Sequence, residues 1–325
     1  MILVTGATGL IGSFITHELI QQGYKVRILT RSSNNLTLIQ DIVSELEIIE
    51  GDILDVYTLQ KAFENIDSVI HTAALVSFNP KDSKQLMKTN VEGTANMVNL
   101  SLDFNIKKFI HIRSIAAIGS TSTNSNLDET SKWNPDEPHS NYAFSKHKSE
   151  LEVWRGIEEG LPATIINPSV VLGPASYQKS SAKIFAQAIE KGIFTINSFV
   201  NVVDVRDVTT SVIKLLTSNI IGERFILNAG IISYTDLISE IRKHNGLNKP
   251  KYTVPLWLIK IYAKVRQLIS AITFKPSEIT TDSIRSLTKP THYNGAKITH
   301  SVNMEYKPIL ETLAWCCKNI VDKKQ

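Results

Sequence analysis

Short runs of β-branched and aliphatic residues alternate with longer stretches of helical periodicity over the first two-thirds of the chain. The first run, Ile2–Val4, is followed by apolar residues at helical spacing from Leu10 to Leu19, and Gly23 ends that pattern. Further strands are predicted at 26–29, 47–49, 68–70, 109–112 and 164–166, with a later short strand at 201–203. Strands that alternate with helices favour parallel pairing with right-handed crossovers. The pattern therefore predicts an α/β fold with a Rossmann-type doubly wound parallel sheet.

The alternation of predicted strands and helices ends after about Asn228. Two helical stretches, 234–244 and 256–272, then precede a polar segment at 276–295. We interpret this region as belonging to a smaller, mostly helical C-terminal substrate-binding part. The predicted division gives residues 1–166 to a dinucleotide-binding domain, to which residues 201–228 return. The substrate-binding part then comprises 167–200 and 229–325. Because ligands of open α/β sheets bind at the carboxyl ends of the strands, we expect the substrate between the two parts.

Composition narrows the class of protein. The 325 residues are 42% hydrophobic and 20% charged, which excludes a disordered or fibrous chain. A net charge of +4 spread along the chain does not indicate a nucleic-acid partner. The two cysteines are adjacent, at Cys316 and Cys317, so they indicate neither a disulfide framework nor a zinc site. We expect no metal, a small-molecule substrate and a reducing compartment.

The chain shows no pattern of a targeting segment, because Met1 leads straight into the first strand and a glycine loop. The stretch 256–274 is apolar but contains Lys260, Lys264 and Arg266, which makes it too charged to span a bilayer alone. A pocket lid, a dimer contact and a membrane-surface helix all remain open for it, with a lid or core helix favoured. We predict a cytoplasmic protein without a membrane partner.

A glycine loop joins the first strand to the first helix. Gly6, Gly9 and Gly12 permit a tight turn, close approach of the backbone to a pyrophosphate, and close packing of helix on strand. The N-terminus of the helix then offers oriented N–H donors to the anion. The first interval is one residue longer than in the common dinucleotide fingerprint. The loop predicts a dinucleotide as cofactor.

The segment TGATGLIG resembles the short-chain dehydrogenase/reductase superfamily, in its extended branch of epimerases, dehydratases and reductases. Further pieces agree in order along the chain: GD at 51–52, HTAA at 71–74, TNVEGT at 89–94, PSVVLGP at 168–174 and DVRD at 204–207. The resemblance, together with Arg31 discussed below, implies these cofactor-binding residues: Gly6, Thr8, Gly9, Leu10, Ile11, Gly12, Arg31, Asp52, Ile53, Thr72, Ala73, Ala74, Asn90, Tyr142, Lys146 and Pro168.

Several of these residues also have ordinary explanations. Asp52 can be a turn residue after Gly51, and Asn90 can cap the helix that follows it. His71 at the end of a strand is more often a structural histidine than a catalyst. The joint order of the motifs along one chain is what favours the functional interpretation.

The predicted catalytic residues are Ser114, Tyr142 and Lys146. Tyr142 and Lys146 are four residues apart, so they share one face of a helix. A nearby cation favours the phenolate and lowers the pKa of a tyrosine, which otherwise is about 10. By resemblance, Lys146 also binds the nicotinamide ribose, and Ser114, five residues before Gly119, bonds the reacting oxygen. Arg113 stands where the family usually has a small residue. Its side chain can narrow the pocket, bind an anionic group of the substrate or point away from the site, and we favour the last.

The segment NPSVVLGP at 167–174, together with VSFNP at 76–80, looks more like the dihydroflavonol and aldehyde reductases and the 3β-hydroxysteroid dehydrogenases than the sugar epimerases. We therefore predict reversible hydride transfer between a carbonyl and an alcohol. Two alternatives stay open. One is a nucleotide-sugar epimerase or dehydratase, and the other is a non-catalytic NAD(P)-binding regulator.

Two further expectations concern the cofactor and the assembly. The second strand ends in Thr30-Arg31-Ser32-Ser33 without an acid, whereas an NAD enzyme usually has Asp or Glu there. Arg31 can bind a 2′-phosphate, so NADP(H) is predicted to be preferred, with NAD(H) possible. The helices around 83–102 and 142–154 resemble those that pair across a two-fold axis in the family, which predicts a homodimer.

Overall fold

The computed structural model describes residues 1–33, 35–118, 126–174, 182–255, 257–259, 261 and 291–320. Its main sheet contains seven parallel strands in the order β11-β7-β5-β4-β1-β2-β3. The strands are β1 (Ile2–Thr5), β2 (Val26–Thr30), β3 (Leu46–Glu50), β4 (Ser68–His71), β5 (Lys108–Ile112), β7 (Ala163–Pro168) and β11 (Glu223–Leu227). The predicted doubly wound sheet is confirmed.

The chain leaves β1 toward β2 and β3 on one side and later returns to β4 and β5 on the other. Because the chain first adds strands on one side of β1 and then on the other, the strand order reverses between the neighbouring strands β1 and β4. The carboxyl ends of these two strands are thus the topological switch point, where open α/β sheets bind their ligands. Both β1 and β4 are almost fully buried, as expected for strands covered on both faces.

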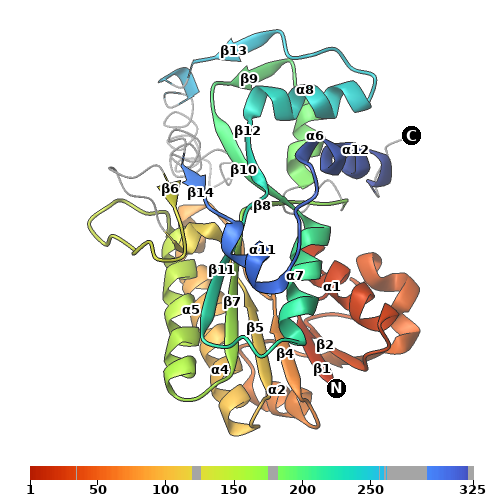
Figure 1. Ribbon diagram of the computed structural model, residues 1–325, viewed down its shortest axis with the longest axis vertical. Coiled ribbons are helices and arrows are strands. Elements are labelled where there is room, and N and C mark those ends of the chain that lie inside the picture. The colour runs from red at the N-terminus through yellow and green to blue at the C-terminus, as the bar shows by residue number, and fades with distance from the viewer. Residues whose placement is uncertain are drawn as a thin grey trace.

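Helices cover both faces of the sheet, which gives three layers (Figure 1). On one face, α1 (Leu10–Gln21) and α7 (Val205–Leu216) pack their buried apolar residues against the sheet, and α11 (Ala296–Val302) joins them. On the other face lie α2 (Val56–Phe63), α4 (Gly93–Asp103) and α5 (Asn141–Glu158). The helix before α4 runs as α3 (Ser83–Leu86) into a π-helical turn, Met87–Glu92. Short 3₁₀ helices span Thr37–Glu45, Pro80–Asp82 and Ile115–Ala117.

A second group of elements stands over the carboxyl ends of the main strands (Figure 1). It has its own core, formed by side chains of β8, α6, β10, α8 and α12. Its small sheets pair β8 (Val170–Leu172), β10 (Phe199–Asp204) and β12 (Gly230–Ser233), then β9 (Phe194–Ile196) with β13 (Tyr252–Val254), and β6 (Asn126–Leu127) with β14 (His292–Tyr293). The helices are α6 (Ala182–Lys191), α8 (Tyr234–His244) and α12 (Ile309–Asn319).

The predicted helix at 234–244 is confirmed as α8. The strand predicted at 201–203 exists as β10, but it joins the small sheet rather than the main one. The chain returns to the main sheet only at β11, a strand the sequence pattern did not predict. The predicted helix at 256–272, most of the polar segment at 276–295, and Gly119 lie outside the described residues.

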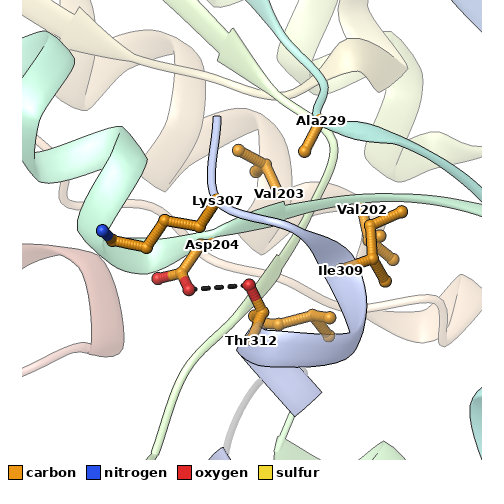
Figure 2. Close-up of a pocket in the computed structure, with 8 residues that line it drawn as sticks. Val202, Val203, Asp204, Ala229, Lys307, Ile309 and Thr312 are labelled. Atoms are coloured by element: carbon orange, nitrogen blue, oxygen red, sulfur yellow. Dashed lines mark hydrogen bonds between the residues drawn. The ribbon is translucent and has the colours of Figure 1, made fainter. Parts of the chain in front are cut away.

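Two carboxylates of the DVRD segment join the upper part to the main sheet. Asp204, 1% exposed, caps α7 and accepts hydrogen bonds from the Thr312 hydroxyl (2.8 Å) and from Arg206 (2.6 Å). Asp207 accepts the backbone N–H of Lys307 at 3.0 Å. Figure 2 shows Asp204 and Thr312 bonded beside Val202, Val203 and Ile309. The hollow between these side chains has no room for a water molecule, so it is a packed junction.

Candidate active site

The glycine loop forms a cradle that side chains would fill. Gly6 has φ +73°, and a Cβ there would lie 2.5 Å from the Thr72 hydroxyl oxygen. A Cβ on Gly12 would lie 2.2 Å from the carbonyl oxygen of Gly6. The turn is closed by the N–H of Gly9, which donates to that same carbonyl at 3.0 Å. Glycine at 6 and 12 is therefore required by the close approach of loop and helix.

The first turn of α1 is open to an anion. Its N-cap is Gly9, which offers no side-chain acceptor, and no acidic residue lies in the first turn. The N–H groups of this turn thus keep the partial positive charge of the helix end. Thr8 is half-buried and Gly9 exposed beside them, while Leu10 and Ile11 begin the helix. An uncapped helix end at the switch point fits the pyrophosphate of a dinucleotide.

On the β2 and β3 side, the residues expected to face the adenosine lie at strand ends. Arg31 is exposed directly after β2. The Ser33 N–H donates to the carboxylate of Glu50, the last residue of β3, at 3.3 Å. Asp52 accepts the N–H of Leu54 at 2.9 Å and so forms the turn that its ordinary explanation predicts. Ile53 is buried, and a Cβ on the helix residue Gly93 would lie 2.5 Å from its Cδ1.

The loop after β4 follows the glycine loop closely. The Thr72 hydroxyl donates to the carbonyl of Thr5 at 2.7 Å, and the Ala73 N–H lies 3.3 Å from the Thr5 hydroxyl. Ala73 is half-buried and Ala74 is exposed. Small residues here keep the surface between the two loops free of bulky side chains. The segment can therefore run alongside a bound dinucleotide.

Asn90 connects this loop to α5. Its amide accepts the N–H of Leu75 at 2.8 Å and donates to the Leu75 carbonyl at 3.0 Å. The same amide nitrogen lies 3.0 Å from the hydroxyl of Ser145 on α5. Asn90 is 1% exposed within the π-helical turn, so it does not cap the following helix. These bonds give it a positioning role for the helix that carries Tyr142.

The predicted catalytic side chains come together at the N-terminal half of α5. Ser140 caps the helix by accepting the N–H of Ala143 at 3.0 Å, and Tyr142 follows in the first turn. The Lys146 ammonium lies 5.6 Å from the centre of the Tyr142 ring. Lys146 is 3% exposed and Tyr142 is half-buried. The tyrosine thus keeps part of its surface exposed, while the lysine is buried.

Ser114 meets Tyr142 from the end of β5. It caps the short helix 115–117, and its hydroxyl accepts the N–H of Ala116 at 3.2 Å. Its side chain is close enough to the phenol of Tyr142 to act on it as a hydrogen-bonding group that lowers the phenol's pKa. Its backbone carbonyl accepts the side chain of the buried Asn167 at 3.1 Å. These backbone contacts hold the serine in place.

The pKa of Tyr142 differs from the expectation that a nearby cation lowers it. Burial raises the pKa of the phenol above its ordinary value, while the hydrogen bond of Ser114 and the positive charge of Arg113 act in the opposite direction. Desolvation of the phenolate outweighs the two stabilising groups. Tyr142 is consequently protonated at neutral pH and can serve as a proton donor.

The cations and histidines beneath the phenol are strongly perturbed. Burial and the charge of Arg113 hold the pKa of Lys146 well below its ordinary value. The rings of His71 and His111 stack with their centres 4.9 Å apart. Burial and the neighbouring cations lower the pKa of His71 to about 3 and that of His111 well below its ordinary value. Both histidines are therefore neutral; His71 bonds the hydroxyls of Thr5 and Thr94, as the structural explanation predicts.

Arg113, which is expected to point away from the site, is turned into the protein interior. Its side chain is buried, 5% exposed, and donates to the hydroxyl of Ser149 on α5. The strand end from which it projects is covered by that helix, so an outward path is closed. The sequence gives no sign of this, because Ser149 is ordinary at its position on a helix.

Two further residues escaped the sequence analysis. The ring of Phe78, 40% exposed, lies 5.4 Å from that of Tyr142 and forms an apolar surface beside the phenol. Asn167 joins Ser114 to Glu150 of α5, whose carboxylate it reaches at 2.9 Å. Both stand in quoted segments, VSFNP and NPSVVLGP, which are the signal that could have identified them. Pro168 ends β7 next to Asn167 and is buried.

Among the described residues, no three His, Cys, Asp or Glu side chains gather as metal ligands. Within the same part of the chain, no helix combines the length and apolarity needed to cross a bilayer.

Comparison with known proteins agrees with this geometry. The model of the NAD dependent epimerase/dehydratase family matches residues 2–226. The putative dihydroflavonol 4-reductase of Synechocystis sp. is 27% identical over 317 residues, which cover 96% of this chain and 92% of that protein. The crystal structure of gox2253 has a TM-score of 0.84 at 27% identity and covers 98% of this chain and 97% of that one. The UDP-glucose 4-epimerase of Thermotoga maritima has a TM-score of 0.78 at 20% identity, with 98% and 97% covered, and shows the same fold.

Proposed function

The chain belongs to the NAD-dependent epimerase/dehydratase family, and we propose that it is a reductase that transfers hydride between NADP(H) and the carbonyl group of a small molecule. The observation that carries the proposal is the meeting of Ser114 and Lys146 around a protonated Tyr142, at the same strand ends as the glycine loop. The 27% identical relative named as a putative reductase, aligned over 96% of the chain, adds support.

The residues have distinct roles in this reaction. The glycine loop and the first turn of α1 hold the pyrophosphate, and Lys146 orients the ribose next to the nicotinamide. The bound nicotinamide supplies the hydride. Ser114 donates a hydrogen bond to the substrate carbonyl oxygen and stabilises the charge that develops there. Tyr142 then gives its proton to that oxygen.

The substrate is proposed to lie against Phe78. Its exposed ring next to Tyr142 offers an apolar face. An aromatic or otherwise apolar group next to the carbonyl would pack on this ring. A charged sugar phosphate finds less to bind there.

The nucleotide-sugar epimerase or dehydratase is the second candidate, and the family description favours it. Sugar-modifying neighbours at about 20% identity share only the fold with this chain, so they do not decide the reaction. A non-catalytic regulator is disfavoured, because Ser114, Tyr142 and Lys146 are all present.

Purified protein with NADPH and a panel of apolar ketones, aldehydes and nucleotide sugars tests the proposal. Net consumption of NADPH with a ketone or aldehyde supports the reductase. Conversion of a nucleotide sugar without net consumption identifies an epimerase or dehydratase. Tight cofactor binding without turnover of any compound supports the regulator.

The proposal includes a homodimer and a cytoplasmic location. Leu151 on α5 is 43% exposed on the outer surface of the α4–α5 layer, which is the place where a partner helix would pack. The outer residues of α4, such as Asn99 and Asp103, are polar. For the location, the support is that Cys316 and Cys317 are buried thiols rather than a disulfide.

A further inference from the structure

Arg113 is built into the interior behind the catalytic tyrosine. It follows β5 directly, and its backbone N–H donates to the carbonyl of Ile166 on β7 at 2.7 Å. The sheet thus fixes the backbone from which the side chain starts. At the other end, Nη1 of the guanidinium donates a hydrogen bond to the hydroxyl of Ser149. A guanidinium in such a place is permanently charged, because burial lowers its pKa only to about 10.

The remaining donors of this guanidinium are not used. Nε and Nη2 of Arg113 are buried and have no hydrogen-bond partner among the described residues. The carboxylate of Glu150 stands next to Ser149 on α5, but its oxygens bond Arg224 and Asn167, each at 2.9 Å. No carboxylate of the described chain pairs with Arg113. A buried cation without a bonded counter-ion is costly, unless an anion forms beside it during function.

The other charged and titratable groups around the phenol do not supply that anion. His71 of β4 and His111 of β5 are neutral, and neither ring nitrogen of His111 has a partner among the described residues. On α5, burial and the charge of Arg113 lower the pKa of Lys146, burial lowers that of His147, and neither side chain can carry a negative charge. The carboxylate of Glu150 accepts hydrogen bonds from Arg224 and Asn167 instead. The proposed reaction produces one new negative charge in this place, on the oxygen of Tyr142.

We propose that Arg113 is a positioning residue whose positive charge stabilises the phenolate of Tyr142. The inference rests on the proposed reductase function. In the reduction, hydride adds to the carbonyl carbon and the electron pair of the C=O bond moves to oxygen. The O–H bond of Tyr142 breaks, its proton passes to that oxygen, and the phenolate remains until solvent returns a proton. The charge of Arg113 offsets the phenolate in the interval.

The direction of the electrostatic effect agrees with this role. The positive charge of Arg113 lowers the pKa of Tyr142, against the rise caused by burial. In return, the negative charge of Glu150 and, to a smaller extent, negative charge at Tyr142 favour the charged form of Arg113. Removing the guanidinium charge should therefore leave the phenol less acidic.

Ionisation of Tyr142 can be measured directly without a substrate. Uniform labelling with 3-fluorotyrosine makes the phenols more acidic, and ¹⁹F NMR reports each ionisation. Comparison with Tyr142→Phe assigns the Tyr142 signal among the nine tyrosines. Arg113→Met should decrease the ionisation constant of Tyr142 about tenfold or more. Arg113→Lys, which keeps the charge, should stay near the wild-type value. Arg155→Met is the matched control, since Arg155 is a half-buried arginine of α5, the helix of Tyr142, and pairs with Glu152 and Glu159.

An unchanged ionisation constant in folded Arg113→Met overturns the proposal. If Arg113→Met does not fold, Arg113→Gln, which can still bond Ser149, takes its place, and equal constants for the Gln and Lys variants overturn the proposal. A higher KM for carboxylate-bearing substrates alone, with unchanged ionisation, instead makes Arg113 a substrate-binding group. Absence of any reductase activity contradicts the proposed function but leaves the ionisation measurement valid.

Discussion

The side-chain amide of Asn90 lies 3.0 Å from the hydroxyl of Ser145, and this contact ties the loop after β4 to α5, the helix that carries Tyr142. Ser145 in turn donates to the carbonyl of Tyr142 at 2.8 Å. The bond thus links the two sides of the candidate site through one buried side chain.

Replacing Asn90 by Ala should lower both stability and turnover. The N–H and carbonyl of Leu75 lose their partner, which costs about 1–3 kcal/mol of unfolding free energy. Because α5 can then shift, kcat should fall roughly tenfold or more. Asn96→Ala is the matched control, since Asn96 lies on α4 and bonds the carbonyl of Ile53. Chemical unfolding and steady-state kinetics of both variants test this; equal kcat in the two contradicts it.

Replacing Tyr142 by Phe should remove most of the turnover and leave cofactor binding nearly intact. Only the transferable proton is deleted, and such groups contribute about 10²–10⁴-fold. The measurements are kcat on a verified substrate and NADPH affinity by fluorescence titration. Tyr57→Phe, at a tyrosine 68% exposed, serves as control. Near wild-type turnover in Tyr142→Phe would refute the assigned mechanism.

Arg31→Ala should weaken NADPH binding about ten- to a hundredfold and leave NADH binding nearly unchanged. The guanidinium at the end of β2 is proposed to bind the 2′-phosphate, which NADH lacks. Glu50→Gln should act in the opposite direction, because the Glu50 carboxylate next to Ser33 repels that phosphate. Calorimetric titration with both cofactors measures these changes. Equal loss for both, or tighter binding of NADH by the wild type, would exclude the NADP(H) preference.

Asp207 should make stability depend on pH. Burial raises its pKa to about 6 in the folded protein, against 3.8 as its ordinary value. Since the folded pKa is the higher one, protonation of Asp207 favours the folded state at acid pH, and this contribution is lost as the pH rises through about 6. Relative to wild type, Asp207→Asn should gain up to about 3 kcal/mol between pH 4 and pH 7. Urea unfolding at both pH values measures it, with Asp103→Asn on the surface of α4 as control. A difference independent of pH would contradict the prediction.

Sedimentation equilibrium at micromolar concentration should give about twice the 36.2 kDa of the chain. Leu151→Glu should shift the equilibrium to the monomer, because a charge would then be buried against the partner helix. Leu310→Glu, on the exposed side of α12, should leave the dimer intact. A wild-type species of 36.2 kDa alone would rule out the dimer.

Local patterns were sufficient for most of the main sheet. The helical spacing from Leu10 to Leu19 and the clear periodicity of α8 predicted both helices within a few residues. β11 was missed because it begins with Glu223 and Arg224, whose charges are satisfied by tertiary partners, Lys297 and Glu150. Such partners are invisible in a local window.

The candidate site was predictable to the extent that it follows motifs. Ser114, Tyr142 and Lys146 lie in recognisable segments, and the structure brings them together. The burial of Arg113 depends on how α5 covers the end of β5, and the raised pKa of Tyr142 depends on the desolvation that results. Neither follows from residue spacing.

The π-helical turn Met87–Glu92 makes the length of its helix a functional constraint. A π-turn holds about one residue more than an α-turn, so deleting one residue would give regular helical hydrogen bonds and a better helix. The deletion would also rotate the preceding turn by about 100°, because each α-helical residue turns by that angle. Asn90 would then face away from Leu75 and Ser145. A homologue that lacks this residue must brace its tyrosine helix by other means, even where the flanking sequences align without a mismatch.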